Sequence, residues 1–440
     1  MPEEHLINSV NKHYLDRVMK LADAADIMAT EDIFDARGMK LVAKGTKISP
    51  SLQERLSQRQ LNKPFESSIA VDSGVDVSVI ANEAKRIVET IEPVRAIVQT
   101  VSGQSPVQVL SGIQFGSAMS TMLTLIERGG PRALEHSVMV SLLSICLGRK
   151  LGMSSTDQTI VALAGLLHDI GELYIEPQYL HSRSHLYPHE WRHVVVHPRI
   201  GQMLISNLES YPAAVAQAVF EHHERYDGSG YPRQVSGSSI SAAGQVVATA
   251  EMISGVFVNP DHPLQRAELA LKVVPGEYVH QLVSAVSSAA RQARSEKGMT
   301  GNAATTGEEK NKVAELHKHI GAVLETTQRL ADSGVLKSQK AKHLLAEVER
   351  RTTKVQHAFS STGLDSSLDE KSGFFDPHNI DVLFETSVVS SEFKWRLRDV
   401  ARDLSLQAAA LEAHETQALQ PLVELLDGER PKDAGVSAPN

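Results

Sequence analysis

The chain has 440 residues, of which 42% are hydrophobic and 22% charged, and its formal net charge at pH 7 is −9. This length favours two or three domains, and the acidic balance argues against a general nucleic-acid-binding protein. The single cysteine, Cys146, excludes an intramolecular disulfide framework and a cysteine-rich zinc site. Apolar runs such as TIVALAGLL are too short to cross a bilayer and the N-terminal MPEEHLINSV lacks a signal-peptide core, so we expect a cytoplasmic protein without a membrane or nucleic-acid partner.

Residues 1–75 mix short strand-like segments with turns, and they predict a small β-containing accessory module. Gly38 and Gly45 flank the segment MKLVAK, as tight turns beside short strands require. Ser49 followed by Pro50 fits the start of a helix, with Glu54 in its first turns. None of these residues suggests catalysis.

Residues 76–295 are predicted to form a helical domain, because apolar residues recur at helical spacing in several segments. One of them, VMVSLLSICLGRKLG, ends at Gly152, which fits a C-cap. Pro188 is expected in the first turn of a helix with the sequence PHEWRHVVVHP, which would place His189, His193 and His197 on one face. Strands do not alternate with helices here as a parallel sheet would require, so the fold class is mainly α.

The C-terminal part is predicted to consist of a linker at 296–305, a helical domain at 306–426 and a disordered tail at 427–440. Three apolar stripes at helical spacing indicate a bundle or hairpin: Val313, Leu316, Ile320, Val323 and Leu324; Leu344, Leu345 and Val348; and Phe393, Leu397, Val400 and Leu404. An internal core is the usual role of such stripes. A surface for a partner protein or for a second copy is the alternative.

Nine of the chain's 19 histidines lie between His136 and His223, more than an even spread would give. His168 and Asp169 follow an apolar run, and neighbours on a helix point about 100° apart, so they can share a metal site only where other helices converge. A bridging carboxylate holds two cations close together, with imidazoles in the outer positions. Further candidates lie in separate segments: His136, His197, His222, His223 and Glu251. Each alone is better explained as a hydrogen-bonded core or boundary residue, and it is their joint order that favours a metal site.

The motifs HDIG, HPRIG and HHERYDGSGYP occur in this order, and together they resemble the HD superfamily of metal-dependent phosphohydrolases. The last motif resembles the defining segment of the HD-GYP branch, and the resemblance covers residues 105–290. It implies an HD-type helical bundle, here with a small β-containing N-terminal module and a C-terminal helical region. It also implies two or three bound metals, commonly iron or manganese, and hydrolysis of cyclic di-GMP in bacterial signal transduction.

The resemblance also assigns roles to residues. The implied metal ligands are His136, His168, Asp169, His197, His222 and His223, with Glu251 where the family usually has Asp. Asp169 would be the bridging carboxylate at the catalytic centre. Two cations would lower the pKa of a bridging water and offset charge in the transition state. Whether Gly230, Tyr231 and Pro232 contact the ligand or a protein partner is left open, as is a partner for the C-terminal helices.

Three further features depart from the family pattern. Glu172 stands where relatives usually carry a lysine that neutralises substrate phosphate, and only Arg266 is basic in the segment EMISGVFVNPDHPLQR. Arg132 occupies the place of a glutamate that holds a third metal in some relatives, so we expect at most two metals. Three hypotheses remain: a phosphodiesterase with altered affinity or substrate, a metal-bearing binding or interaction module with little turnover, and a structural domain with relic motifs.

Overall fold

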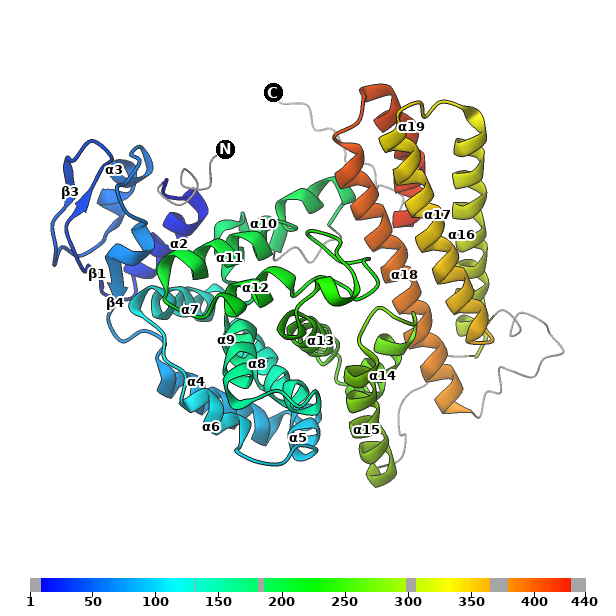
Figure 1. Cartoon of the computed structure of the whole chain (residues 1–440), viewed down its shortest axis with the longest axis horizontal. Helices are drawn as coiled ribbons and strands as arrows, with labels where there is room; N and C mark the ends of the chain where they lie inside the picture. Colours follow the sequence, from blue (N-terminus) through cyan, green and yellow to red (C-terminus); the bar gives the residue numbers. More distant parts are fainter. Residues whose placement is uncertain (1–8, 131, 181–185, 298–305, 365–378, 429–440) are drawn as a thin grey trace. The chain divides into compact units, whose positions relative to one another are not determined.

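The computed structural model of the chain describes residues 9–130, 132–180, 186–297, 306–364 and 379–428, and it is mainly α-helical, with short strands near the N-terminus (Figure 1). This confirms the predicted fold class. The chain divides into two compact units. Unit 1 comprises residues 1–183, 193–267 and 276–296, and unit 2 comprises residues 184–192, 268–275 and 297–440. His181, His185 and most of the predicted linker lie outside the described residues.

The N-terminal part of unit 1 pairs four short strands in two antiparallel ladders, β1 with β4 and β2 with β3. Its elements are α2 (Lys12–Ala22), β1 (Ile27–Ala29), β2 (Ile33–Phe34), β3 (Lys40–Val42), η1 (Pro50–Leu52), α3 (Gln53–Ser57), η2 (Phe65–Ser68) and β4 (Ile69–Val71). Gly38 turns the chain between β2 and β3 with a φ of 82°, and Gly45 follows β3 with a φ of 75°. The turns expected at these glycines and the helical turn expected at Ser49–Pro50 are both present.

Helices then continue to residue 297. They are α4 (Val77–Thr90), α5 (Glu92–Gln99), α6 (Pro106–Ser111), α7 (Ser117–Gly129), α8 (Ala133–Lys150), α9 (Ser155–Leu167), η3 (Ile170–Tyr174), α10 (Pro177–Leu180), η4 (Pro188–His193), α11 (His197–Leu208), α12 (Ala213–Glu221), η5 (Gly237–Ser239), α13 (Ala242–Val256), α14 (Pro263–Lys272) and α15 (His280–Lys297).

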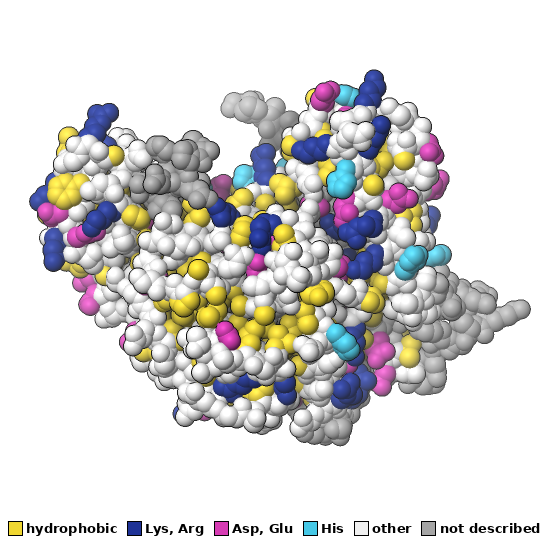
Figure 2. All heavy atoms as spheres, viewed as in Figure 1, with side chains coloured by type: hydrophobic (Ala, Val, Ile, Leu, Met, Phe, Trp, Pro, Cys, Tyr) yellow, Lys and Arg dark blue, Asp and Glu magenta, His cyan; other side chains and the backbone are white. Residues whose placement is uncertain are grey.

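The central element of unit 1 is α8, which is buried on every side over most of its length and packs against α9 and α13. At Gly165 of α9 an added Cβ would lie 2.9 Å from the Cα of Ser141, so the α8–α9 approach requires glycine. Gly152 ends α8 in the left-handed conformation, as expected of a C-cap, with a φ of 73°. Hydrophobic side chains gather on the surface where Figure 1 places α8, α9 and α13 (Figure 2).

The helix expected to start at Pro188 does begin there, but it is shorter than predicted and ends before His197. Residues 188–193 form a separate 3-10 turn, η4, and α11 starts at His197 with Pro198 in its first turn. Both prolines fit a helix start, because proline lacks the N–H that a first turn leaves unsatisfied anyway. Because η4 ends at His193 and α11 begins at His197, His189, His193 and His197 do not share one helical face.

Unit 2 is built around four helices, α16 (Thr306–Ser333), α17 (Gln339–Ser361), α18 (Ile380–Ala408) and α19 (Ala413–Asp427). The three predicted apolar stripes form one internal core, with Leu324 partly buried at its edge. The fourth helix was not predicted, and it adds Leu419, Leu422, Val423 and Leu426 to this core. A buried ion-pair network ties α17 to α18, because Arg351 contacts Asp399 at 2.9 Å and Asp403 at 3.0 Å. None of the helices in the described part of the chain combines the length and apolar character needed to span a bilayer.

We expect Phe393→Ala to destabilise the C-terminal bundle without stripping metal from unit 1. Phe393 is fully buried, with its ring centroid 5.9 Å from that of Phe359. Removing a buried phenylalanine side chain costs about 3–5 kcal/mol. Trp395→Ala, on the same helix but 41% exposed, is the control and should change the unfolding free energy little. Denaturant unfolding followed by circular dichroism, together with metal content, checks this; loss of metal in Phe393→Ala alone would show that the two units are not independent.

Candidate metal centre

The HD motif lies where α9 gives way to the 3-10 turn η3. His168 follows the last residue of α9 and is completely buried, and Asp169 comes directly before η3. Gly171 lies so close to the start of α11 that an added Cβ would overlap the carbonyl oxygen of His197. The same Cβ would lie 2.9 Å from the backbone nitrogen of Gly201. The glycines of HDIG and HPRIG therefore allow the contact that brings Asp169 and His197 together.

One group of potential ligands consists of Asp169, His197, His222 and His223, whose ligand atoms all lie within 4.8 Å of one another. His197 comes from the first residue of α11, and the histidine pair follows α12. The Oδ1 atom of Asp169 is 3.5 Å from His197 Nε2 and 3.7 Å from His222 Nε2. Four donors of these types around one point suit a transition metal.

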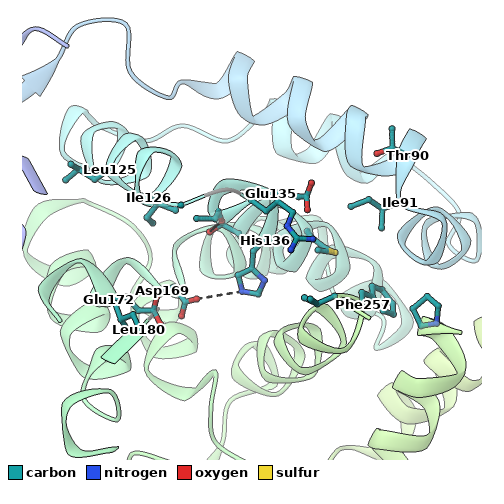
Figure 3. A pocket seen from close by; sticks show the side chains of 18 of the residues that line it. Thr90, Ile91, Leu125, Ile126, Glu135, His136, Asp169, Glu172, Leu180 and Phe257 are labelled. Carbon is teal, nitrogen blue, oxygen red and sulfur yellow. Dashed lines mark hydrogen bonds and ion pairs between the residues drawn. The ribbon is translucent and has the colours of Figure 1, made fainter. Parts of the chain in front are cut away.

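The second group consists of His136 from α8, His168 and Glu251 from α13. Glu251 Oε2 lies 3.1 Å from His136 Nε2 and 3.2 Å from His168 Nε2. The Oδ2 atom of Asp169 lies 2.9 Å from His168 Nε2 and 3.7 Å from His136 Nε2, a contact visible in Figure 3. Asp169 thus presents one oxygen to each group, which is the geometry of a bridging carboxylate.

The outer nitrogens of four histidines are held by hydrogen bonds. Nδ1 of His168 is 2.9 Å from the Gly165 carbonyl oxygen, and Nδ1 of His197 is 2.8 Å from that of Val194. His222 Nδ1 likewise contacts the Val219 carbonyl oxygen. A carbonyl can only accept, so each Nδ1 carries a proton, and each Nε2 can bind a cation once it is deprotonated.

His136 is held by a serine instead, because its Nδ1 lies 3.0 Å from Ser254 Oγ, a hydroxyl that can donate or accept. Sequence reasoning missed Ser254. The signal was its spacing, three residues after Glu251, which places both side chains on one face of α13.

The electrostatics of the centre fit cations. Burial alone would raise the pKa values of Asp169 and Glu251, but His168 and His136 respectively hold them well below the usual range. Burial, reinforced by His222, lowers the pKa of His197 to about 4, so this imidazole is neutral and able to bind a metal. Glu251 Oε2 accepts no hydrogen bond from the described residues despite its burial. This oxygen lies close to the Nε2 atoms of two histidines, and a cation between the three atoms would stabilise the contact.

The GYP segment contacts a histidine of the centre. Gly230 packs so closely against the backbone around His223 and Arg225 that an added Cβ would overlap the Arg225 nitrogen and the His223 carbonyl oxygen. Tyr231 donates its N–H to His223 O at 3.1 Å, and its ring stacks on the His223 ring with centroids 4.5 Å apart. Here the segment orients His223. Sequence reasoning did not find this stacking, because it depends on the return of the chain after the DGSG turn.

A cavity of about 790 Å³ opens beside the second ligand group. His136, Asp169 and Glu172 line it, together with Thr90 at the end of α4, Ile91 after it and Phe257 after α13 (Figure 3). Burial, reinforced by the Asp169 carboxylate, raises the pKa of Glu172 well above its usual range. The cavity lies in unit 1 and has the size typical of a small-molecule site, roughly 300–1,000 Å³.

Arg132 and Arg266, the two arginines singled out in the sequence, differ in their position relative to the cavity. Arg132 lines the cavity at the start of α8 and its side chain is exposed. Arg266 contacts Asp261 at 3.2 Å and is not among the described residues that line the cavity.

Comparison with known proteins identifies the class to which this fold and this centre belong. Residues 120–254 match the family model described as HD domain. The chain is 24% identical over 241 residues to a 3′3′-cGAMP-specific phosphodiesterase of Vibrio cholerae, covering 54% of this chain and 48% of that protein. It is 32% identical over 158 residues to a cyclic di-GMP phosphodiesterase of Thermotoga maritima, covering 34% of this chain and 43% of that protein. An HDG"Y"P protein from Bdellovibrio bacteriovorus aligns at 16% identity with a TM-score of 0.32, covering 60% of this chain and 95% of that one.

Residues 120–254 are therefore similar to the HD domain family. This likeness agrees with the motif resemblance, and the two curated relatives are named as cyclic-dinucleotide phosphodiesterases. The chain spans less than half the length of these two curated relatives.

We expect Asp169→Ala to abolish the metal-dependent rise in melting temperature. Metal at 100 times its dissociation constant stabilises the native state by about 2.7 kcal/mol, and this stabilisation disappears when the shared ligand is lost. The control is Asp157→Ala, an exposed aspartate in the first turn of α9. Melting curves with and without chelator, and elemental analysis, check this. Two metals retained by Asp169→Ala would contradict a bridging role.

Proposed function

We propose that the chain is a metal-dependent phosphodiesterase that hydrolyses a cyclic dinucleotide, cyclic di-GMP or 3′3′-cGAMP. The observation that carries the proposal is the placement of Asp169, whose two oxygens face separate groups of histidine and carboxylate donors. Such a pair of sites, opening on a cavity of about 790 Å³, suits the in-line attack of hydroxide on a phosphodiester. The names of the relatives support cyclic dinucleotides as the substrate class.

The proposed cofactor is a pair of divalent cations, iron or manganese. His136, His168 and Glu251 would hold one, His197, His222 and His223 the other, and Asp169 would bridge them. When bound, two cations lower the pKa of a water between them and offset charge on the phosphodiester. The protein fixes the direction of each Nε2 lone pair through the hydrogen bonds at Nδ1.

The direct test is hydrolysis by the full chain loaded with manganese or with ferrous iron. Cyclic di-GMP and 3′3′-cGAMP are supplied separately, and the linear dinucleotide and mononucleotides are quantified. Asp169→Asn, which keeps the shape but removes the charge, should lose activity with both substrates. Absence of cleavage by the metal-loaded wild type would refute the phosphodiesterase proposal.

Glu172 favours a second candidate, a metal-bearing module that binds a cyclic dinucleotide and acts through protein contacts with little turnover. The carboxyl lines the cavity at the position where relatives usually have lysine, so it removes a cation from the phosphate site. Tight binding of cyclic dinucleotide without product formation would favour this candidate over the enzyme.

We expect Glu172→Lys to strengthen binding of cyclic di-GMP about fivefold, because a full charge placed near phosphate contributes about 1 kcal/mol in water-like surroundings. Added salt should reduce the difference from wild type. The control is Glu176→Lys, which makes the same change at an exposed position just after η3. Calorimetric titration and metal content check the prediction. If Glu172 instead orients the metal ligands, Glu172→Lys will lose metal. Equal affinity and equal metal content in this variant and the wild type would show that Glu172 does not act on the bound cyclic dinucleotide.

A further inference from the structure

The N-terminal module is fixed to the HD motif by an aromatic contact. The ring of Tyr14 on α2 stacks on the ring of Tyr174 at the end of η3, with centroids 5.2 Å apart and an interplanar angle of 18°. The Tyr174 hydroxyl donates a hydrogen bond to Glu66 of η2. Tyr14 and Glu66 are buried. Helix α2 therefore has a defined position against the turn that follows His168 and Asp169.

Arg17 lies three residues after Tyr14, on the same face of α2, and it lines the cavity. Its Nη2 is 3.4 Å from the Glu172 carbonyl oxygen and 3.3 Å from that of Ile175, long distances for N–H···O hydrogen bonds. Its Nε is buried and has no hydrogen-bond partner among the described residues. Its Nη1 lies 4.0 Å from where a Cβ on Gly129 would stand, and Gly129 lines the same cavity. The guanidinium thus retains hydrogen-bonding capacity at the cavity wall.

The charged residues around the cavity indicate a role for the guanidinium of Arg17. Among the described residues that line the cavity, two are arginines, Arg17 and Arg132, one is a histidine, His136, and four are acids: Glu92, Glu135, Asp169 and Glu172. Arg132 is exposed. A cyclic dinucleotide carries two phosphodiesters, and a metal pair at Asp169 can hold only the one that is cleaved. The other phosphodiester would lie in a cavity with more acids than bases.

We propose that Arg17 binds the second phosphodiester of a cyclic dinucleotide, the one that the metal pair does not hold. This inference rests on the proposed function and adds a specificity-determining residue to it. An arginine suits the role because its planar guanidinium can donate two parallel hydrogen bonds to phosphate oxygens. The N-terminal module contains none of the predicted metal ligands. Through Arg17 it supplies the positive charge that relatives usually carry as a lysine at position 172.

The test compares a substrate with two phosphodiesters to one with a single phosphodiester, using the manganese-loaded full chain. Arg17→Gln should raise KM for cyclic di-GMP about tenfold and leave kcat unchanged, because a charge-assisted contact made equally in ground and transition states is lost. Hydrolysis of bis(p-nitrophenyl) phosphate, which has one phosphodiester, should be unaffected. Arg17→Lys, which keeps the charge, should recover part of the affinity.

The matched control is Arg55→Gln. Arg55 belongs to the same module and also donates to a backbone carbonyl, that of Leu41 at 3.1 Å, but it does not line the cavity. If Arg17 only supports η3 through the carbonyls of Glu172 and Ile175, Arg17→Gln will slow both substrates equally and reduce metal content. That result, or an unchanged KM for cyclic di-GMP, would overturn the proposal.

The same variants separate this inference from the proposed function. If the wild type cleaves bis(p-nitrophenyl) phosphate but neither binds nor cleaves a cyclic dinucleotide, the substrate class is wrong and the role of Arg17 is refuted with it. If the wild type binds cyclic di-GMP without cleaving it, equilibrium dialysis replaces KM. Arg17→Gln should then still raise the dissociation constant about tenfold, and an unchanged constant would refute the role.

Discussion

The double contact of Asp169 is the constraint on which the rest of the HD domain depends. Its Oδ2 lies 2.9 Å from His168 Nε2 and its Oδ1 lies 3.5 Å from His197 Nε2, so one side chain joins two groups of donors. Adjacent residues on a regular helix point about 100° apart. Here α9 ends immediately before His168 and a 3-10 turn begins after Asp169, so the two neighbours converge on one centre. The remaining ligands must then arrive from α8, α11, α12 and α13.

Bringing these elements so close requires glycine at defined contacts. A side chain at Gly171 would push α11, and hence His197, away from Asp169, and one at Gly230 would displace His223. The motifs HDIG and HHERYDGSGYP therefore combine ligands with the residues that let backbones approach. The cost of burying several imidazoles and carboxylates together is offset by their mutual interactions, which hold the pKa of Asp169 well below its usual range.

The sequence predicts what is local or motif-bound, and it fails where distant segments meet. The three apolar stripes of the C-terminal bundle and the convergence of His136, His197 and Glu251 followed from spacing and motif order. The start of α11 did not, because Pro188 and Pro198 satisfy the same local rule and only packing against η3 decides between them. The proximity of Arg17 to Glu172 involves residues 155 positions apart, and no periodicity encodes such a contact.

Residues 17 and 172 lie in separate segments of the chain, yet both line the same cavity, so a cation at either position could face the ligand. A lysine on the HD motif would depend only on η3, whereas Arg17 depends on α2, and α2 is held by the stack of Tyr14 on Tyr174 and by the contact of Tyr174 with Glu66. If Arg17 binds phosphate, ligand affinity depends on the folding of the N-terminal module. By thermodynamic reciprocity, a bound cyclic dinucleotide would in turn stabilise the attachment of that module to η3. The small module would then act as a ligand-dependent part of the site, although every predicted metal ligand lies outside it.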